Sequence, residues 1–188
     1  PESRLNNDLS YGYNRARLAF YNIDPIFFLT GNSLTPDNIR RDKNELSNHY
    51  VRQVFEREVF PFKDSNTGQA IILPTFDLAF YPTIRGPYNF TTSGLTSSGT
   101  LTNPRSRWGG IFRKLETNDF EALNIEFIEM WMLDPFIYNK TSAGGDLYFN
   151  LGNITEDILK DGRKSMENGL PIDGNTAKTE STIWGRVP

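Results

Sequence analysis

Cysteine is absent from the 188 residues, and histidine occurs once, at position 49. The chain therefore forms no disulfide and no thiolate metal site. A zinc site, or a nucleophile activated by a histidine, would have to use His49, which neither a cysteine nor a Gly-x-Ser-x-Gly turn accompanies. A phosphate-binding glycine loop is also missing. We therefore expect no enzymatic activity, no metal and no cofactor.

Two further absences concern membranes and nucleic acids. No apolar run approaches the roughly 18 residues of a membrane-spanning helix, so no such segment is expected. The 20 basic and 23 acidic residues give a net charge of −3 without the basic face or tail of a nucleic-acid-binding protein. The first residues lack the layout of a signal peptide, and we expect a fragment of a larger protein.

Aromatic and turn-forming residues, in contrast, are abundant. Hydrophobic residues make up 37% of the chain and aromatic residues 13%, which is typical of a packed protein and not of a disordered one. The 14 Phe and 8 Tyr beside 15 Gly and 11 Pro favour strands and turns over a helical bundle. A chain of this length needs only one folded domain, with or without arms.

Residues 1–69 are predicted to form an N-terminal arm with one long helix over about residues 36–59. Thr35 is a suitable N-cap, and Pro36 suits the first helical position. Apolar residues then recur at spacings of three and four until Pro61 ends the helix.

From residue 70 the apolar spacing becomes alternating, which is typical of strands. Turn-rich strands with little helix between them favour a β-sandwich over residues 70–170. Residues 171–188 are predicted to form a C-terminal coil. Across the whole chain, strands are expected at 15–24, 70–82, 107–115, 121–135 and 145–151.

Glu126 and Glu129 interrupt the apolar stretch 124–136 and raise the question of an acid/base pair. Successive side chains of a strand point to opposite faces, so these two carboxylates lie on different sides. They therefore cannot flank a sugar as the carboxylates of a glycosidase do. Both faces are largely apolar, which predicts a central strand and an ion pair of Glu129 with an arginine such as Arg113.

Two loops carry candidate ligand-binding residues. Asp64, Asn66 and Gly68 are spaced as in a calcium loop, but the downstream acidic ligand is missing, so an Asx-turn is the better interpretation. Tyr88 and Trp108 stand beside glycine or proline turns, where their rings either stack on a sugar or pack within the protein. The sequence leaves both interpretations of these aromatic residues open.

Five long blocks of the chain resemble, in the same order, blocks of one known protein family. They read YGYNRARLAFYNIDP, SNHYVRQVFEREVFP, DLAFYPTIRGPYNF, RWGGIFRKLETNDFEALNIEFIEMWMLDPF and GDLYFNLGNITEDILKDGRKSMENGLP. The family is SprA, also called Sov, the very large outer-membrane translocon of the Bacteroidota type IX secretion system, linked in some members to gliding motility. The order of the last blocks also resembles the galactose-binding-like jelly rolls of carbohydrate-binding modules.

The resemblance implies a soluble domain of a single-chain β-barrel that passes folded cargo across the outer membrane. Its expected work is to shape or cap the pore and to contact other parts of the translocon chain, type IX secretion subunits and secreted cargo. Arg85 and Tyr88 in the turn TIRGPYNF, with Trp108 beside them, are the predicted contact residues. The alternative is a cell-surface glycan-binding β-sandwich, in which Tyr88 and Trp108 stack on sugar rings.

Overall fold

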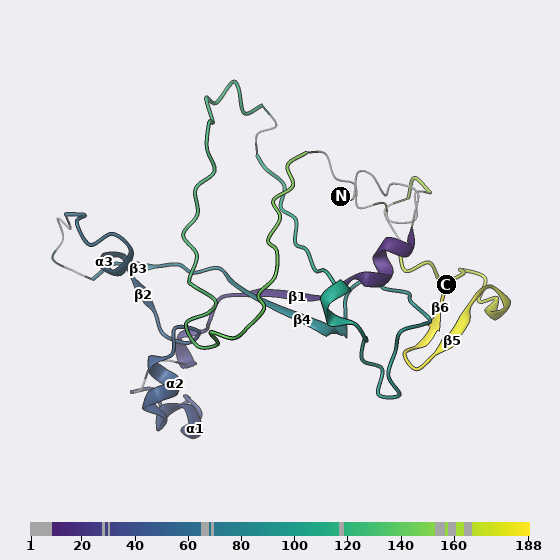
Figure 1. Cartoon of the computed structure of the whole chain (residues 1–188), viewed down its shortest axis with the longest axis horizontal. Helices are drawn as coiled ribbons and strands as arrows, with labels where there is room; N and C mark the ends of the chain where they lie inside the picture. The colour runs from purple at the N-terminus through teal and green to yellow at the C-terminus, as the bar shows by residue number, and fades with distance from the viewer. Residues whose placement is uncertain are drawn as a thin grey trace.

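Short antiparallel strand pairs and a few short helices make this a mainly β protein (Figure 1). The described residues form three separate two-stranded sheets. Short 3-10 helices lie at Leu9–Asn14, Pro25–Phe27 and Pro104–Ser106. The computed structural model describes residues 9–27, 29, 31–64, 68, 70–116, 119–152, 157, 161–163 and 167–188, with the backbone alone for residues 9 and 11.

Strands β1 (Ala16–Tyr21) and β4 (Asp77–Arg85) form an antiparallel ribbon through the middle of the molecule (Figure 1). Leu18 pairs with Phe80 near the centre of this ribbon. Both strands lie where the alternating apolar residues predict them, and that part of the prediction is confirmed. A two-stranded sheet has only edge strands, which is why Pro82 is tolerated within β4.

The ribbon contains a bulge on β4. Ala16 pairs with Arg85, whereas the next β1 residue already pairs with Tyr81, so the β4 residues in between lack a partner on β1. The carbonyl of Thr83 in this bulge instead accepts a hydrogen bond of 2.8 Å from the amide of Leu101. The bulge therefore brings the Ser/Thr-rich loop that follows β4 against the ribbon.

The predicted long helix over residues 36–59 is wrong. In its place lie α1 (Asp37–Arg40), α2 (Lys43–Ser47), β2 (Val54–Phe55) and α3 (Glu56–Val59). Strand β2 pairs antiparallel with β3 (Ile72–Leu73). Within the described part of the chain, every helix is too short or too polar to traverse a lipid bilayer.

Side chains that bond to the nearby backbone divide this helical segment. The Asp42 carboxylate accepts from the amides of Asn44 and Glu45, both at 3.0 Å, and so caps the start of α2. Asn48 accepts from the amide of Tyr50 at 2.9 Å and adopts an extended backbone, where α2 ends. These local bonds compete with the backbone bonds of a continuous helix.

Thr35 is not the N-cap that the sequence predicts. Its hydroxyl donates to the carbonyls of Ile26 at 2.6 Å and Leu29 at 2.9 Å, and the residue is buried. Helix α1 begins after Pro36 without a side-chain cap. The hydroxyl satisfies two carbonyls of the preceding loop, which leaves it no role at the helix end.

The predicted C-terminal coil contains an ordered hairpin. Strands β5 (Glu180–Thr182) and β6 (Gly185–Val187) pair antiparallel after a 3-10 helix at Thr176–Lys178. Trp184 in the hairpin turn donates from Nε1 to the carbonyl of Gly99 at 2.8 Å. The hairpin is therefore anchored to the Ser/Thr-rich loop, far away in the sequence.

The predicted strands at 107–115, 121–135 and 145–151 do not form among the described residues. Of these segments, only Trp108 makes a bridge, with Arg15. The chain between the ribbon and the C-terminal hairpin instead makes long irregular excursions, drawn in teal and green (Figure 1). Because these strands do not form, the jelly-roll sandwich is not confirmed, and short antiparallel pairs stand in its place.

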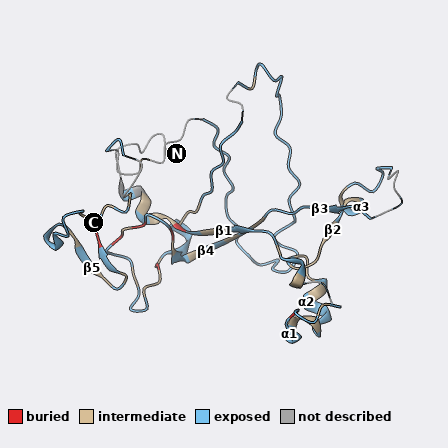
Figure 2. Ribbon diagram, turned by 180° about the vertical axis from the view of Figure 1, so that it is seen from behind, coloured by how far each residue is buried: buried red, intermediate tan, exposed pale blue. Residues whose placement is uncertain are grey.

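Little of the chain is buried (Figure 2). The buried residues that the structure describes, besides glycine, are Ala16, Thr35, Asn89, Thr91, Leu101 and Val187. A compact protein of 21.5 kDa exposes about 9,200 Å², whereas this chain exposes 15218 Å². Far more surface is therefore uncovered than the size of the chain requires.

Candidate functional site

The turn that carries the predicted contact residues is held by a buried amide. Asn89 has no exposed surface, and its Nδ2 donates to the carbonyls of Tyr13 at 2.9 Å and Arg15 at 2.7 Å. Its Oδ1 accepts from the amide of Thr91 at 3.1 Å. One side chain therefore joins the turn after β4 to the segment that leads into β1.

A close backbone approach fixes the other side of the turn. A Cβ at Gly86 would lie 2.4 Å from the carbonyl oxygen of Ala16, so only glycine fits there. The amide of Gly86 also donates to the carbonyl of Arg15 at 3.2 Å. Tyr88 follows with a φ of 55°, in the left-handed region that few residues with a side chain adopt.

Arg15 lies between the two predicted aromatic residues. Its guanidinium carbon is 4.8 Å from the ring centre of Trp108 and 6.0 Å from that of Tyr88. The guanidinium also donates to the carbonyl of Pro87 at 3.3 Å. Backbone hydrogen bonds of 2.7 and 3.1 Å join Trp108 to the residues on either side of Arg15. The structure therefore brings Tyr88 and Trp108 together through a cation that neither prediction included.

Arg85 reaches toward the C-terminal hairpin. Its guanidinium carbon is 4.6 Å from the ring centre of Trp184, and its Nε donates to the carbonyl of Asn89 at 3.0 Å. Partial burial removes water from the guanidinium and lowers the pKa of Arg85 from its ordinary value, although the group keeps its charge at neutral pH. Arg85 thus contacts a different aromatic residue from the one beside which the sequence places it.

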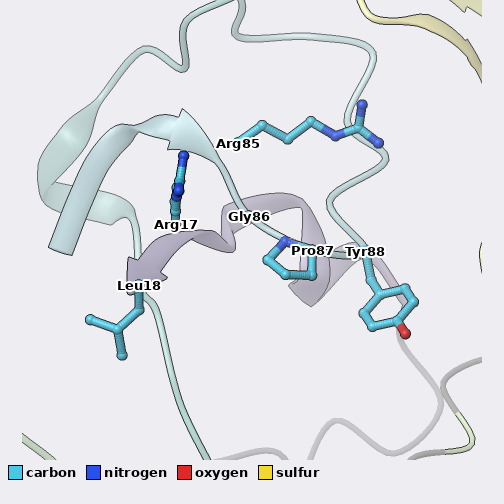
Figure 3. A pocket seen from close by; sticks show the side chains of 6 residues that line it. All are labelled: Arg17, Leu18, Arg85, Gly86, Pro87 and Tyr88. Atoms are coloured by element: carbon cyan, nitrogen blue, oxygen red, sulfur yellow. The ribbon is translucent and has the colours of Figure 1, made fainter. Parts of the chain in front are cut away.

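An open hollow of about 490 Å³ lies beside the turn and is lined by Arg17, Leu18, Arg85, Gly86, Pro87 and Tyr88 (Figure 3). The guanidinium of Arg85 and the ring of Tyr88 extend to separate sides of it (Figure 3). Within the described part of the chain, Arg17 and Arg85 form no ion pair. Small-molecule sites enclose most of their ligand. This open, positively charged surface suits contact with an acidic or aromatic group of a partner protein.

Three residues that build this site were missed by sequence reasoning: Arg15, Asn89 and Trp184. The GPYN sequence predicts a turn at residues 86–89, and the structure contains it, but a turn pattern does not predict burial of the asparagine. The contacts of Arg15 and Trp184 join segments about 70 to 100 residues apart. No local sequence pattern signals contacts of this kind.

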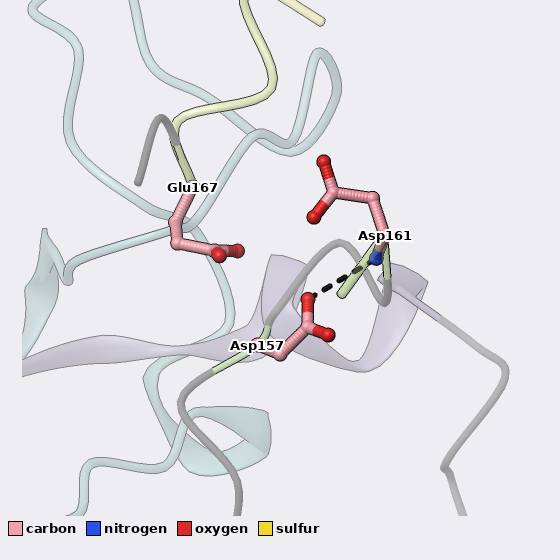
Figure 4. A group of neighbouring side chains, drawn as sticks. All are labelled: Asp157, Asp161 and Glu167. Atoms are coloured by element: carbon pink, nitrogen blue, oxygen red, sulfur yellow. Dashed lines mark hydrogen bonds between the residues drawn. The ribbon is translucent and has the colours of Figure 1, made fainter. Parts of the chain in front are cut away.

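A group of carboxylates lies outside this site, at Asp157, Asp161 and Glu167 (Figure 4). Their oxygens lie within 4.8 Å of one another. Asp157 accepts from the amides of Asp161 at 3.2 Å and Gly162 at 3.0 Å, as in a local turn. Exposed acidic groups gather at turns without an ion, so we assign no metal site here. In the calcium-like loop at 63–68, Asn66 lies outside the described residues.

Glu126 and Glu129 are both exposed, in a segment without strand structure. The predicted ion pair of Glu129 with Arg113 does not occur among the described residues. The reason is that neither the strand predicted for Glu129 nor its expected neighbour at 107–115 forms in this structure. Sequence reasoning excludes a glycosidase pair here because of strand geometry, and the structure forms no such strand.

The single histidine contacts one of the irregular excursions. Its Nδ1 lies 2.5 Å from the hydroxyl oxygen of Tyr138, which also accepts from the His49 amide at 2.8 Å. The ring centres of Tyr50 and Tyr138 are 5.2 Å apart, and those of Phe60 and Trp131 are 5.3 Å apart. His49 therefore helps to join the N-terminal arm to the segment around residues 131–138.

Comparison of the chain with protein-family models, curated proteins and solved structures finds no match in any of the three. No relative therefore assigns a role to Arg85, Tyr88 or Trp108. The functional interpretation depends on the geometry of the chain and on the resemblance of its sequence blocks.

Proposed function

We propose that this chain is a non-enzymatic domain of the outer-membrane translocon of type IX protein secretion. It would shape or cap the pore and contact partner subunits or cargo. The observation that carries the proposal is the exposed surface of 15218 Å², against about 9,200 Å² for a compact protein of this mass. Such an excess suits a polypeptide that other polypeptide covers in a permanent assembly. The resemblance to the SprA family supplies the identity of that assembly.

The jelly-roll β-sandwich is part of the same proposal. The segments at 107–115, 121–135 and 145–151 have the alternating composition of strands, although they stand unpaired here. A strand needs a neighbour to satisfy its backbone groups and to cover its apolar face. In the assembled translocon, residues 70–170 would gain those neighbours and complete the sandwich.

The hollow beside the turn is the proposed contact surface. Arg85 and Tyr88 line it from a turn that Gly86 and Asn89 hold in a fixed position. A fixed turn presents its side chains without further ordering on binding, which lowers the entropic cost of contact. Residues in such a turn suit recognition of a partner better than residues of the irregular excursions.

The experiment replaces these two side chains and leaves the turn in place. Arg85→Gln removes the charge and keeps a hydrogen-bond donor. Tyr88→Asn removes the ring and keeps a residue that tolerates a positive φ. Arg105→Gln, on the exposed 3-10 helix Pro104–Ser106, is the matched control. Secretion of a type IX cargo protein and the amount of translocon in the outer membrane are then measured.

We expect the Arg85→Gln, Tyr88→Asn double variant to reduce secretion several-fold while the amount of translocon stays unchanged. The Arg105→Gln control should secrete normally. Normal secretion by the double variant would contradict the role of this turn. Circular dichroism of the purified chain establishes that the turn substitutions leave the fold intact.

A glycan-binding module is the alternative function. The guanidinium of Arg15 lies against the rings of Tyr88 and Trp108, so a sugar stacking on that side would have to displace it. The geometry therefore gives the alternative no specific support. Calorimetric titration of the chain with cell-surface polysaccharide tests it directly, since saturable binding that Trp108→Ala abolishes would favour the glycan-binding function.

A further inference from the structure

The stretch 124–133 has the composition of a buried strand but lies uncovered. The side chains of Phe127 and Trp131 are 77% and 73% exposed, and those of Ile128 and Met132 are 60% and 65% exposed. In extended chain, the odd and even positions point to opposite faces, so both faces expose large apolar groups. Contiguous apolar surface of this kind marks a site where another macromolecule binds.

The backbone of this stretch is uncovered as well. Within the part of the chain that the structure describes, residues 126–133 make no backbone–backbone hydrogen bond to another segment. A buried amide or carbonyl without a partner costs about 1–3 kcal/mol. Burial of the apolar side chains therefore requires a partner that also bonds to the backbone. Another β-strand does so along its whole edge.

Charge restricts the chemistry of that partner. No Lys, Arg or His occurs between Lys114 and Lys140. The same interval contains Glu116, Asp119, Glu121, Glu126, Glu129 and Asp134. Basic residues therefore suit the positions opposite Glu126 and Glu129, where a cross-strand pair of opposite charges contributes about 0.2–1 kcal/mol.

The uncovered area is large enough for a permanent interface. The chain exposes about 6,000 Å² more than a compact protein of its mass would. Obligate interfaces bury about 2,000–5,000 Å² in total. An assembly that covered only part of this excess would already reach the size of an obligate interface.

We propose that residues 124–133 become a central β-strand on assembly, paired on both edges by strands of the surrounding translocon that alternate apolar with basic residues. The proposal depends on the proposed function for the identity of the partner. The partner is other polypeptide of the translocon, and neither a second copy of this chain nor lipid.

Hydrogen exchange followed by mass spectrometry tests the pairing directly. The amides of residues 126–132 are compared in the purified chain and in the detergent-solubilised translocon. We expect rapid exchange in the purified chain, and exchange at least about 100-fold slower in the translocon because strand amides become hydrogen-bonded. Equally rapid exchange in both samples would overturn the proposal.

Two other outcomes would also overturn it. Slow exchange in the purified chain, with sedimentation showing a monomer or a dimer, would place the partner within this chain or in a second copy. Slow exchange that appears when the purified chain is mixed with phosphatidylcholine vesicles would identify lipid as the covering surface. Slow exchange only in the translocon supports the strand pairing.

Substitutions separate the backbone from the side chains. Ile128→Pro removes one amide donor and should abolish the slow exchange in the translocon, whereas Ile128→Ala keeps the donor and should preserve it. Glu126→Lys with Glu129→Lys should weaken the protection, and Glu121→Lys, outside the proposed strand, is the matched control. Unchanged protection in the double charge variant would overturn the basic character of the partner strands.

The two proposals fail in different ways. If the translocon loses secretion when Arg85 and Tyr88 are replaced but residues 126–132 exchange rapidly, the strand pairing is wrong and the proposed function stands. If secretion is normal in that double variant while residues 126–132 are protected, the contact turn is wrong and the strand pairing stands.

Discussion

The segments 85–108 and 124–133 reverse the usual relation between composition and burial. The first is rich in Ser, Thr and Gly, yet it contains the buried residues Asn89, Thr91 and Leu101. The second is one of the most apolar stretches of the chain, yet all of its residues are exposed. Hydrogen bonds to distant backbone groups explain the burial of the first. The second lacks any neighbour that would satisfy its backbone.

The comparison teaches that an apolar pattern states what a segment is able to bury and a partner decides whether it is buried. In the packed segment, Gly86, Asn89 and Trp108 each contact the residues around Arg15. In the exposed segment, the contact of Phe60 with Trp131 joins two rings and leaves the backbone open. Substitutions in the two regions should therefore differ sharply in their effect on stability.

The largest difference is expected between two glycines. Gly86→Ala places a Cβ against the Ala16 backbone and should lower the free energy of unfolding by about 3 kcal/mol, the upper part of the range for overpacking. Gly145→Ala, in the exposed region, meets nothing within 4 Å and should be neutral or slightly stabilising. Urea unfolding followed by circular dichroism measures both. Equal effects would remove the distinction between the regions.

A pair of asparagines gives the next largest difference. Asn89→Ala leaves two carbonyls and one amide without a partner and should destabilise the chain by about 2–3 kcal/mol. Asn139→Ala removes only local bonds with Thr141 on the surface and should cost less than about 0.5 kcal/mol. Urea midpoints at a constant slope report the two losses. A small effect of Asn89→Ala would mean that the turn is not anchored by this side chain.

Arg15 tests the contacts within the packed region. Arg15→Gln removes the cation between Tyr88 and Trp108, with two contacts worth about 0.5–1 kcal/mol each. We expect a loss of about 1 kcal/mol and a change in tryptophan fluorescence, which Arg105→Gln should not cause. If both variants unfold at the same urea concentration, the guanidinium does not hold the rings together.

The smallest effect on stability is expected in the exposed stretch. Phe127→Ser removes a ring that is 77% exposed, so the free energy of unfolding of the purified chain should change by less than about 0.5 kcal/mol. The same change should lower binding of the dye bis-ANS, which reports exposed apolar surface. Leu101→Ser is the counterpart in the packed region and should unfold the chain at lower urea. A large loss of stability from Phe127→Ser would show that this stretch is already packed.

The central ribbon and the turn could be predicted from the sequence. Alternating apolar residues in β1 and β4 act within a few positions, and Gly86 and Pro87 favour a turn wherever they occur together. The long helix could not, because Asp42 and Asn48 form local bonds that a periodic apolar pattern does not register.

The candidate site was predictable only in part. The sequence indicates Arg85, Tyr88 and Trp108 as residues at turns, and the structure places two of them on Arg15 and the third on Trp184. The segments that meet there lie far apart along the chain, and nothing in the local sequence selects their partners.

The sequence by itself determined the chemistry that this chain lacks, the location of its two ribbon strands and the apolar alternation of residues 124–133. Only the tertiary structure decided that Asn89 is buried, that Trp184 covers Arg85 and that the apolar stretch stands open. Local preference acts over a few neighbouring residues. Burial instead requires that distant segments cover an apolar surface and satisfy its backbone groups at the same time.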